Sequence, residues 1–409
     1  MSSRILEIKL EPIGKFFFGR EVVFGGDGTA DPRRRSYLVR TADLPQQTSL
    51  LGMLRQEVLT RNNALLPPSA SAEQRNRATE LVGDVGFDAA RTPNSFGVIR
   101  GLSPLLIGDE AGNRWQPHPL DDEVGRDGDP LRWKGTETET GSGKGGYTLE
   151  NFDPKHDLST QFASGTSKKS LEDFFTSTSQ VGIKVTNRQR WRAPRPGQTE
   201  EEFNQEGMFR QTFARNGVSA YANAANDLNS GPRYHFILRV EVDDSDVQNY
   251  RPLSDTVVNM GGEKSTFKMT VFEVKEGSLD GLFVAPQYHK SIPEVPQGMS
   301  RVLLLSDTYI AKETIEKLGG FVVAKTRPFR FFTTELGKTR NFFLVNHRYD
   351  KARKQGTYDS KGRSQSRRFT LLERGGIILL PADKVTELKY LIESETAFHQ
   401  IGYNYCTAL

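Results

Sequence analysis

Cysteine is the residue type that the chain most clearly lacks. Its 409 residues include one cysteine, Cys406, so an internal disulfide framework and a thiolate zinc site are excluded. The six histidines are scattered without metal-ligand spacing, at positions 118, 156, 235, 289, 347 and 399. His118 lies beside three acids in QPHPLDDE, but the surrounding prolines favour a loop over a metal site. We therefore expect no metal, no cofactor and no Cys–His nucleophilic pair.

Long apolar runs are also absent. No segment approaches the roughly 20 consecutive apolar residues that span a bilayer. The first residues, MSSRILEIKLEPIG, lack the apolar core of a signal peptide. With 36% hydrophobic and 26% charged residues, the sequence predicts a cytoplasmic protein of two to three domains with no membrane partner.

The chain has little net charge of either sign, but its basic residues are concentrated locally. The net charge is only +4, yet segment 321–374 holds fourteen Lys or Arg against four Asp or Glu. Shorter basic runs are Arg33-Arg34-Arg35 and VGIKVTNRQRWRAPR at 181–195. Because clustered Lys and Arg neutralise phosphates and release counterions, three such runs indicate a polyanion-binding protein. For any single run, solvated surface loops are the alternative.

Hydrophobic periodicity predicts strands and a helix in the first half. RILEIKL at 4–10 alternates at period two, as a half-buried strand does. LPQQTSLLGMLRQEVLTRN at 44–62 carries a helical stripe, and Thr48 or Ser49 is expected to cap its N-terminus. Further strands are expected at 96–108 with breaks at Gly101 and Pro104, at 180–186, and at 234–242. This order fits a ferredoxin-like βαββαβ domain over residues 1–250, with an insertion at about 109–175.

The second half repeats this pattern less clearly. Strands are expected at 267–274, 301–306, 321–332 and 375–381. Helices are expected after Asp307 or Thr308, either of which suits an N-cap, and at 385–395. We therefore predict an α+β protein with two ferredoxin-like domains and long loop insertions. The second domain covers 251–409 and has a basic excursion at about 337–368.

Two glycine-rich stretches resemble functional loops. GSGKGG at 141–146 follows GTETET, so it lacks the strand-to-helix setting of a phosphate-binding loop. NMGGEKS contains Gly261, Gly262 and Glu263, and three interpretations arise: a phosphate cradle, a catalytic acid, or a turn. No second acid or metal ligand stands at a recognisable spacing from Glu263. A structural turn is therefore favoured.

Basic residues alternate with aromatic residues in RQRWRAPR and in TRPFRFFTT. Arginine contacts phosphate and aromatic rings stack on unpaired bases, which is what single-stranded RNA binding requires. In the alternative, the phenylalanines of TRPFRFFTT face a core while Arg327 and Arg330 face solvent. The sequence leaves both interpretations open.

Several segments, taken in order, resemble the RAMP superfamily of CRISPR proteins. They are KFFFGRE, LPQQTSLLGMLRQEVL, VGIKVTNRQR followed by EGMFRQTF, NMGGEKS, RGGIILLP and FHQIGYN. The resemblance extends over residues 4–404 and is to the subunit of type III-B (Cmr) complexes that caps the crRNA 5′ tag. It implies a non-catalytic scaffold built from ferredoxin-like domains, with the turn of NMGGEKS near an assembly surface. The implied partners are the single-stranded 5′ tag of the crRNA, the large polymerase-like subunit and the adjacent backbone RAMP subunit, with target RNA nearby.

The residues expected to contact RNA come from this resemblance together with the basic runs. They are Lys15, Arg20, Arg33, Arg34, Arg35, Gln46, Gln47, Thr48, Arg55, Lys184, Arg188, Arg190, Arg192, Arg327, Arg330 and Arg340. Thr48 has the N-cap as an alternative role. No catalytic residue is expected.

Two other functions remain open. Some RAMP relatives are metal-independent endoribonucleases that process precursor crRNA, and His347 in NHRYDKARK, beside Arg348 and Tyr349, is the candidate for that chemistry. The other is a subunit that only bridges proteins.

Overall fold

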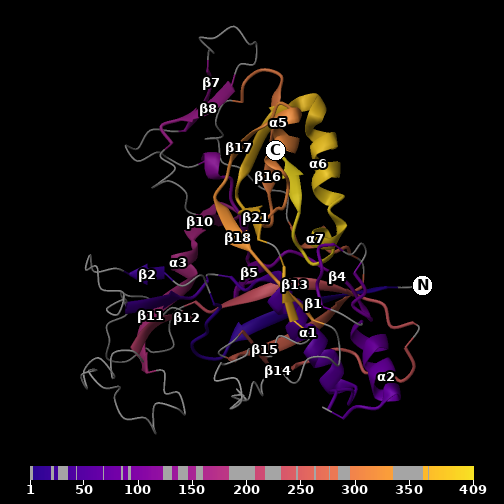
Figure 1. Cartoon of the computed structure of the whole chain (residues 1–409). Helices are drawn as coiled ribbons and strands as arrows, with labels where there is room; N and C mark the ends of the chain where they lie inside the picture. Colours follow the sequence, from indigo (N-terminus) through magenta and orange to yellow (C-terminus); the bar gives the residue numbers. More distant parts are fainter. Residues whose placement is uncertain are drawn as a thin grey trace, which may run out of the picture.

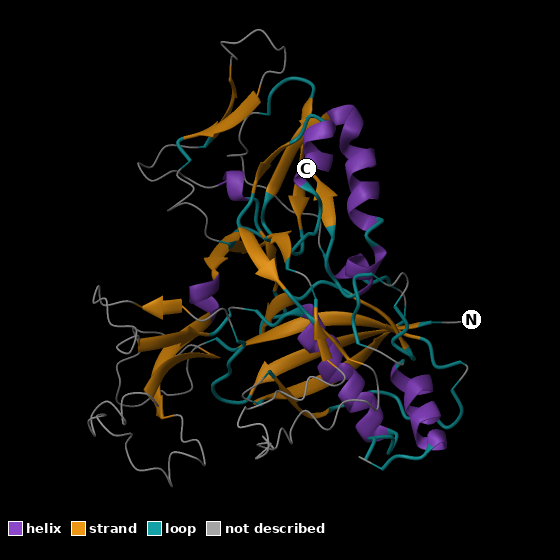
Figure 2. Ribbon diagram, viewed as in Figure 1, coloured by secondary structure: helices purple, strands orange, loops and turns teal. Residues whose placement is uncertain are grey.

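The computed structural model describes most of the chain. The described residues are 3–19, 23–25, 36–42, 44–67, 69–83, 86–90, 94–122, 131–136, 146–152, 160–183, 208–216, 232–245, 247–261, 264–275, 277–283, 295–334, 363–366 and 368–409. They form a mixture of helices and mostly antiparallel sheets, so the predicted α+β class is confirmed (Figure 2).

The first sheet is built around β1 (Arg4–Pro12), with β13 (Tyr234–Val242) on one side and β15 (Ser265–Val274) on the other. It has nine strands in the order β10-β9-β6-β5-β13-β1-β15-β14, and β4 also pairs with β13. The remaining strands are β4 (Ile99–Leu102), β5 (Leu106–Asp109), β6 (Arg114–Pro117), β9 (Gln161–Ser164), β10 (Ser167–Ser170) and β14 (Thr256–Met260).

The centre of this sheet has the ferredoxin-like strand order. β1 is followed by α1 (Gln47–Arg61), then by β5 and β13, and β15 closes the sheet beside β1. If these four strands are numbered along the chain, the spatial order β5-β13-β1-β15 reads 2-3-1-4, and every neighbouring pair is antiparallel. Among the described residues between β13 and β15, strand β14 stands where that fold has its second helix. Since β14 and β15 lie in this sheet, it continues past residue 250.

Helix α1 and helix α2 (Ala72–Val82) pack side by side against the first sheet (Figure 1). In α1 the predicted stripe is buried, because Leu50, Leu54 and Val58 have no exposed surface. The predicted cap is wrong: the helix begins after Gln46, whose side chain makes no capping bond, and Thr48 lies inside the first turn. The Thr48 hydroxyl instead lies 3.5 Å from the Gln46 side-chain oxygen.

A second ferredoxin-like unit lies above the first sheet in Figure 1. Its strands follow the order β17-β22-β16-β23, again second, third, first, fourth, and all pairs are antiparallel. The unit contains β16 (Met299–Leu304), α5 (Lys312–Lys317), β17 (Phe321–Val323), β22 (Ile377–Pro381), α6 (Val385–Glu393), α7 (Thr396–Gln400) and β23 (Cys406–Ala408).

Both faces of this second unit's sheet are covered. On one face Val302, Leu304 and Ile378 pack under α5 and α6. On the other face Leu303, with Ile377 and Leu379, packs against the hairpin of β7 (Arg132–Thr136) and β8 (Gly146–Glu150). This two-sided burial explains why IILL in β22 is an uninterrupted apolar run and not an alternating one.

The remaining elements are smaller. One further sheet has the order β11-β12-β3-β2, and two two-stranded sheets pair β18 with β21 and β19 with β20. Their bounds are β2 (Val23–Gly25), β3 (Ser36–Arg40), α3 (Leu171–Phe174), β11 (Phe175–Ile183), β12 (Met208–Asn216), β18 (Thr326–Phe329), β19 (Phe332–Thr334), β20 (Arg363–Gln365) and β21 (Phe369–Leu372). Single 3-10 turns lie at Leu120–Asp122, Asp280–Leu282 and Ala382–Lys384.

Segment 109–175, expected as a surface insertion, contributes to the first sheet. Its strands β6, β9 and β10 extend that sheet beyond β5. Trp115, Phe162 and Phe174 anchor them, with ring centroids 5.4 and 5.8 Å apart in edge-on contacts. The segment has few aliphatic residues, so its strands were not predicted from the sequence; aromatic side chains form its core instead.

Candidate nucleic-acid interface

The KFFFGR segment meets two other motifs that lie far away in the sequence. The Phe16 amide donates to the Ala214 carbonyl of β12 (2.7 Å), and the Phe17 amide donates to the Ser265 hydroxyl (2.8 Å). Gly261 of NMGGEKS lies beside them at φ +80°, and a Cβ there would stand 2.9 Å from the Phe17 carbonyl oxygen. Glycine is therefore required for this close approach. Gly262 and Glu263 lie outside the described residues.

Aromatic packing holds the backbone of this segment in place. Phe16 is fully buried and contacts Phe175 edge-on at 5.1 Å and Phe236 at 5.8 Å. Phe18 stacks on Phe267, with centroids 6.0 Å apart and planes 9° apart. These packed rings thus form a rigid base that fixes the backbone of the segment, which suits residues that present polar groups to a ligand.

Lys15 is the exposed cation beside this base. Its ammonium group lies 4.5 Å from the centre of the Phe213 ring and donates to the Gln180 side-chain carbonyl. β11 and β12 therefore position Lys15 next to an aromatic ring. A cation beside a ring is a combination that single-stranded nucleic acid binds.

The start of helix α1 meets the glycine turn of FHQIGYN. Gln47 is 1% exposed, and its side-chain amide donates to the carbonyls of Ser103 and Gly402 at 3.3 Å each. Gly402 has φ +88°, and a Cβ there would lie 2.3 Å from the Ser103 carbonyl oxygen. The Gln47 amide, expected to contact RNA, thus joins the two ferredoxin-like units.

Arg55 and Gln46, also expected at this site, lie in different surroundings. The Arg55 guanidinium donates to the carbonyls of Val82 (2.9 Å) and Gly83 (3.4 Å), so it ties α1 to the end of α2. Gln46 is half-buried immediately before the helix.

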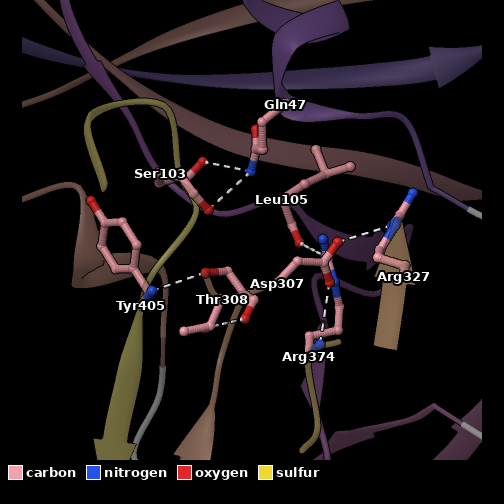
Figure 3. Close-up of polar contacts among 10 residues, drawn as sticks. Gln47, Ser103, Leu105, Asp307, Thr308, Arg327, Arg374 and Tyr405 are labelled. Carbon is pink, nitrogen blue, oxygen red and sulfur yellow. Dashed lines mark hydrogen bonds and ion pairs between the residues drawn. The ribbon is translucent and has the colours of Figure 1, made fainter. Parts of the chain in front are cut away.

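Asp307 is the centre of a buried charge cluster between the two units (Figure 3). Its carboxylate accepts from Arg374 (3.1 Å) and from Arg327 (2.9 Å), and Arg374 also donates to the Leu105 carbonyl at 3.1 Å. Burial raises the pKa of Asp307, but the charges of Arg374 and Arg327 outweigh burial and leave the pKa lowered. The Asp307 carboxylate is therefore charged and paired.

Sequence reasoning missed this cluster. Asp307 and Thr308 were expected to cap a helix, but α5 begins later, after Ala311, and no side chain caps it. Arg327 was expected to contact RNA, and its guanidinium faces Asp307. Arg374 was counted only as part of a basic segment. No local signal exists, because Asp307 lies 20 and 67 residues from its two partners.

The phenylalanines of TRPFRFFTT belong partly to the core. Phe329 is 2% and Phe331 is 6% exposed; both pack against Phe87, and Phe329 also packs against Phe398. The core interpretation therefore holds for these two rings. Arg330, between them, is exposed.

Several predicted residues lie outside the described part of the chain. They are Arg20, Arg33, Arg34, Arg35, Lys184, Arg188, Arg190, Arg192 and Arg340, as well as His347, Arg348 and Tyr349.

Within the described ranges, no three His, Cys, Asp or Glu side chains gather as a metal site would require. His118 is buried with its Nε2 2.8 Å from an Asp122 oxygen, and Lys168 lies 3.2 Å from the same oxygen. Cys406 is buried, and burial raises the pKa of its thiol to about 12. None of the described helices has both the length and the apolar character of a transmembrane segment.

The fold defines the chain as an α+β protein with two ferredoxin-like sheets joined through a polar interface. No family model and no curated sequence matches it. Among solved structures, it is similar to a chain in a cryo-EM structure of the Type III-B Cmr-beta bound to cognate target RNA, with 12% identity, TM-score 0.43 and coverage of 99% of this chain and 96% of the other. A second such structure, with cognate target RNA and AMPPnP in state 1, gives 12% identity, TM-score 0.43 and coverage of 98% and 96%.

Proposed function

We propose that this chain is a non-catalytic, RNA-binding scaffold subunit of a type III-B CRISPR effector complex and acts in the cytoplasm. In this role it holds the repeat-derived 5′ tag of the crRNA. It also bridges the large polymerase-like subunit to the adjacent backbone subunit, with target RNA nearby.

The observation that carries the proposal is how the motifs meet in space. KFFFGRE contacts NMGGEKS through Phe17 and Ser265, 248 residues apart. The LPQQTS helix start contacts FHQIGYN through Gln47 and Gly402, 355 residues apart. Segments that were grouped only by a resemblance to one superfamily thus share two structural centres. The exposed Lys15 and Arg330 and the basic runs supply the positive charge that tag binding needs.

A salt-dependence measurement tests the role of the first basic run. Replacing Arg33, Arg34 and Arg35 together with alanine is expected to weaken binding of a 5′-tag oligonucleotide. The slope of log affinity against log salt concentration should flatten by about two, because each neutralised phosphate of a single strand contributes about 0.7. Fluorescence anisotropy at several salt concentrations measures both quantities.

The matched control removes the same charge elsewhere. Lys312, Lys317 and Lys384 are lysines of the second unit that are not expected at RNA; the first two are exposed and Lys384 is about half exposed. Their triple alanine variant should keep the wild-type slope. A wild-type slope in the arginine variant, or an equal loss in the lysine variant, would contradict a tag site at this run.

Absence of catalysis is tested by incubating the full-length protein with repeat-containing RNA in EDTA. We expect intact RNA. Specific cleavage that disappears in His347→Ala would replace the scaffold role with a metal-independent endoribonuclease. If RNA stays bound to the assembled complex when all basic runs are neutralised, the subunit would only bridge proteins.

A further inference from the structure

A cavity of about 740 Å³ lies between the two ferredoxin-like units, and its lining includes none of Asp307, Arg327 and Arg374. The first unit contributes Glu241 of β13 and the turn that contains Asp280. The second unit contributes Glu393 of α6 together with His399 and Tyr405. Cavities of roughly 300 to 1,000 Å³ hold drug-sized ligands, so this one accommodates a long side chain with its flanking backbone.

The charge of the cavity is negative. Glu241, Asp280 and Glu393 line it, and none of the three forms an ion pair with another described residue. Lys389 is the one lysine or arginine among the described lining residues. Burial lowers the pKa of His399, although Glu393 and Asp280 oppose the shift, so the imidazole is neutral near pH 7. A cationic ligand is therefore favoured and an RNA phosphate is repelled.

Tyr405 provides a second, independent feature. It is 7% exposed, lines the cavity, and points away from Asp307 and its neighbours in Figure 3. Its hydroxyl bonds to no described protein group, whereas its backbone amide is held by the Ser306 hydroxyl at 2.9 Å. The ring stacks on His399, with centroids 4.3 Å apart and planes 8° apart. The hydroxyl of this largely buried side chain thus has no described partner at the cavity, beside a rigid aromatic pair.

The spacing of the carboxylates discriminates between kinds of cation. The three acids do not gather closely enough to hold a metal ion in the described part of the chain. A guanidinium group differs from a metal ion, because it is planar, donates five hydrogen bonds in several directions, and tolerates aromatic neighbours. Carboxylates spread around a cavity with one acceptor hydroxyl match that group.

We infer that this cavity binds an arginine side chain presented by a peptide segment of a partner protein. Glu241, Asp280 and Glu393 accept from the guanidinium, the Tyr405 hydroxyl supplies a further acceptor, and the Tyr405–His399 pair contacts its plane. The site is independent of RNA binding, so it can be correct whether or not the proposed function is.

The test uses the full chain and three probes: the peptide acetyl-GGRGG-amide, the same peptide with neutral citrulline in place of arginine, and spermidine. Ligand-observed saturation-transfer NMR measures binding. We expect the arginine peptide to bind at least tenfold more tightly than the citrulline peptide, because charge-assisted hydrogen bonds are lost in the latter. Equal binding of the two peptides, or tighter binding of spermidine, would overturn the assignment.

Variants locate the bound peptide. Glu241→Gln with Asp280→Asn is expected to reduce affinity at least tenfold, whereas Asp383→Asn, which neutralises an exposed acid outside the cavity, should change it less than twofold. Tyr405→Phe removes only the hydroxyl, so the stack and the fold remain, and affinity should fall about threefold to tenfold. Wild-type affinity in both the double variant and Tyr405→Phe would exclude this cavity as the site.

Discussion

Replacing Asp307 with alanine is expected to lower the free energy of unfolding by about 3 to 5 kcal/mol, because the change leaves buried positive charge without its counter-charge. The Arg374 side chain is 6% exposed and lies 3.1 Å from the Asp307 carboxylate, and Arg327 lies 2.9 Å from it. Water cannot replace the lost carboxylate at so buried a position. Urea unfolding of the full chain, followed by circular dichroism, measures the change.

The pH dependence of the same site has a defined sign. Because the pKa of Asp307 is lowered in the folded chain, its contribution to stability is fully present above about pH 4 and is lost as the pH falls through the lowered pKa. The stability difference between wild type and Asp307→Asn should therefore be constant near neutrality and shrink in acid. A difference that grows as the pH falls would contradict the charged pairing.

Glu387→Ala is the matched control for this prediction. Glu387 also pairs with a cation, Lys384 at 3.0 Å, but both side chains are about half exposed. Exposed pairs contribute at most about 1 kcal/mol, so its loss should be small. If both alanine variants lose similar stability, Asp307 does not hold a buried charge cluster.

The second large effect is expected at the glycine turn. Gly402→Ala should destabilise the fold by about 2 to 5 kcal/mol, because two costs add at one position. The backbone conformation, φ +88°, disfavours any side chain, and the added Cβ would lie 2.3 Å from the Ser103 carbonyl and 2.7 Å from the Gln47 side-chain nitrogen. Thermal and urea unfolding both measure the loss.

Gly298→Ala separates the two costs. Gly298 has a similar φ of +78°, but a Cβ there would meet nothing within 4 Å. This variant should therefore lose only the conformational part, about 1 to 2 kcal/mol. Equal losses at Gly298 and Gly402 would mean that the helix start and the glycine turn are not in close contact.

The strands with clear periodicity could be predicted from the sequence. RILEIKL, expected as a strand over 4–10, lies in β1 (Arg4–Pro12), and YHFILRVEV became β13 with the expected bounds. The 96–108 segment did divide into β4 and β5 around Pro104, but the break expected at Gly101 is wrong, because Gly101 lies inside β4 and pairs with Glu241. The sequence pattern was enough to place a strand where the order of apolar and polar residues reflects which positions are buried.

Pairings over long sequence distances could not be predicted. Asp307 suited an N-cap by residue type, and only the fold brings Arg374 to it. Gln47 was expected to contact RNA, yet it is buried and its side-chain amide donates to the carbonyls of Ser103 and Gly402. For the candidate site, the sequence identified the segments that meet but not which of their side chains would be used for contacts within the chain.

The central position of β1 has a consequence for synthesis. Leu6, Ile8 and Leu10 leave the ribosome well before their neighbours in the sheet, β13 and β15, which follow more than 220 residues later. At about 5 to 20 residues per second, the nascent chain carries this apolar strand unpaired for roughly 10 to 50 s. Such high contact order slows closure of the first sheet, so chaperones that shield exposed strands should raise the yield of folded protein.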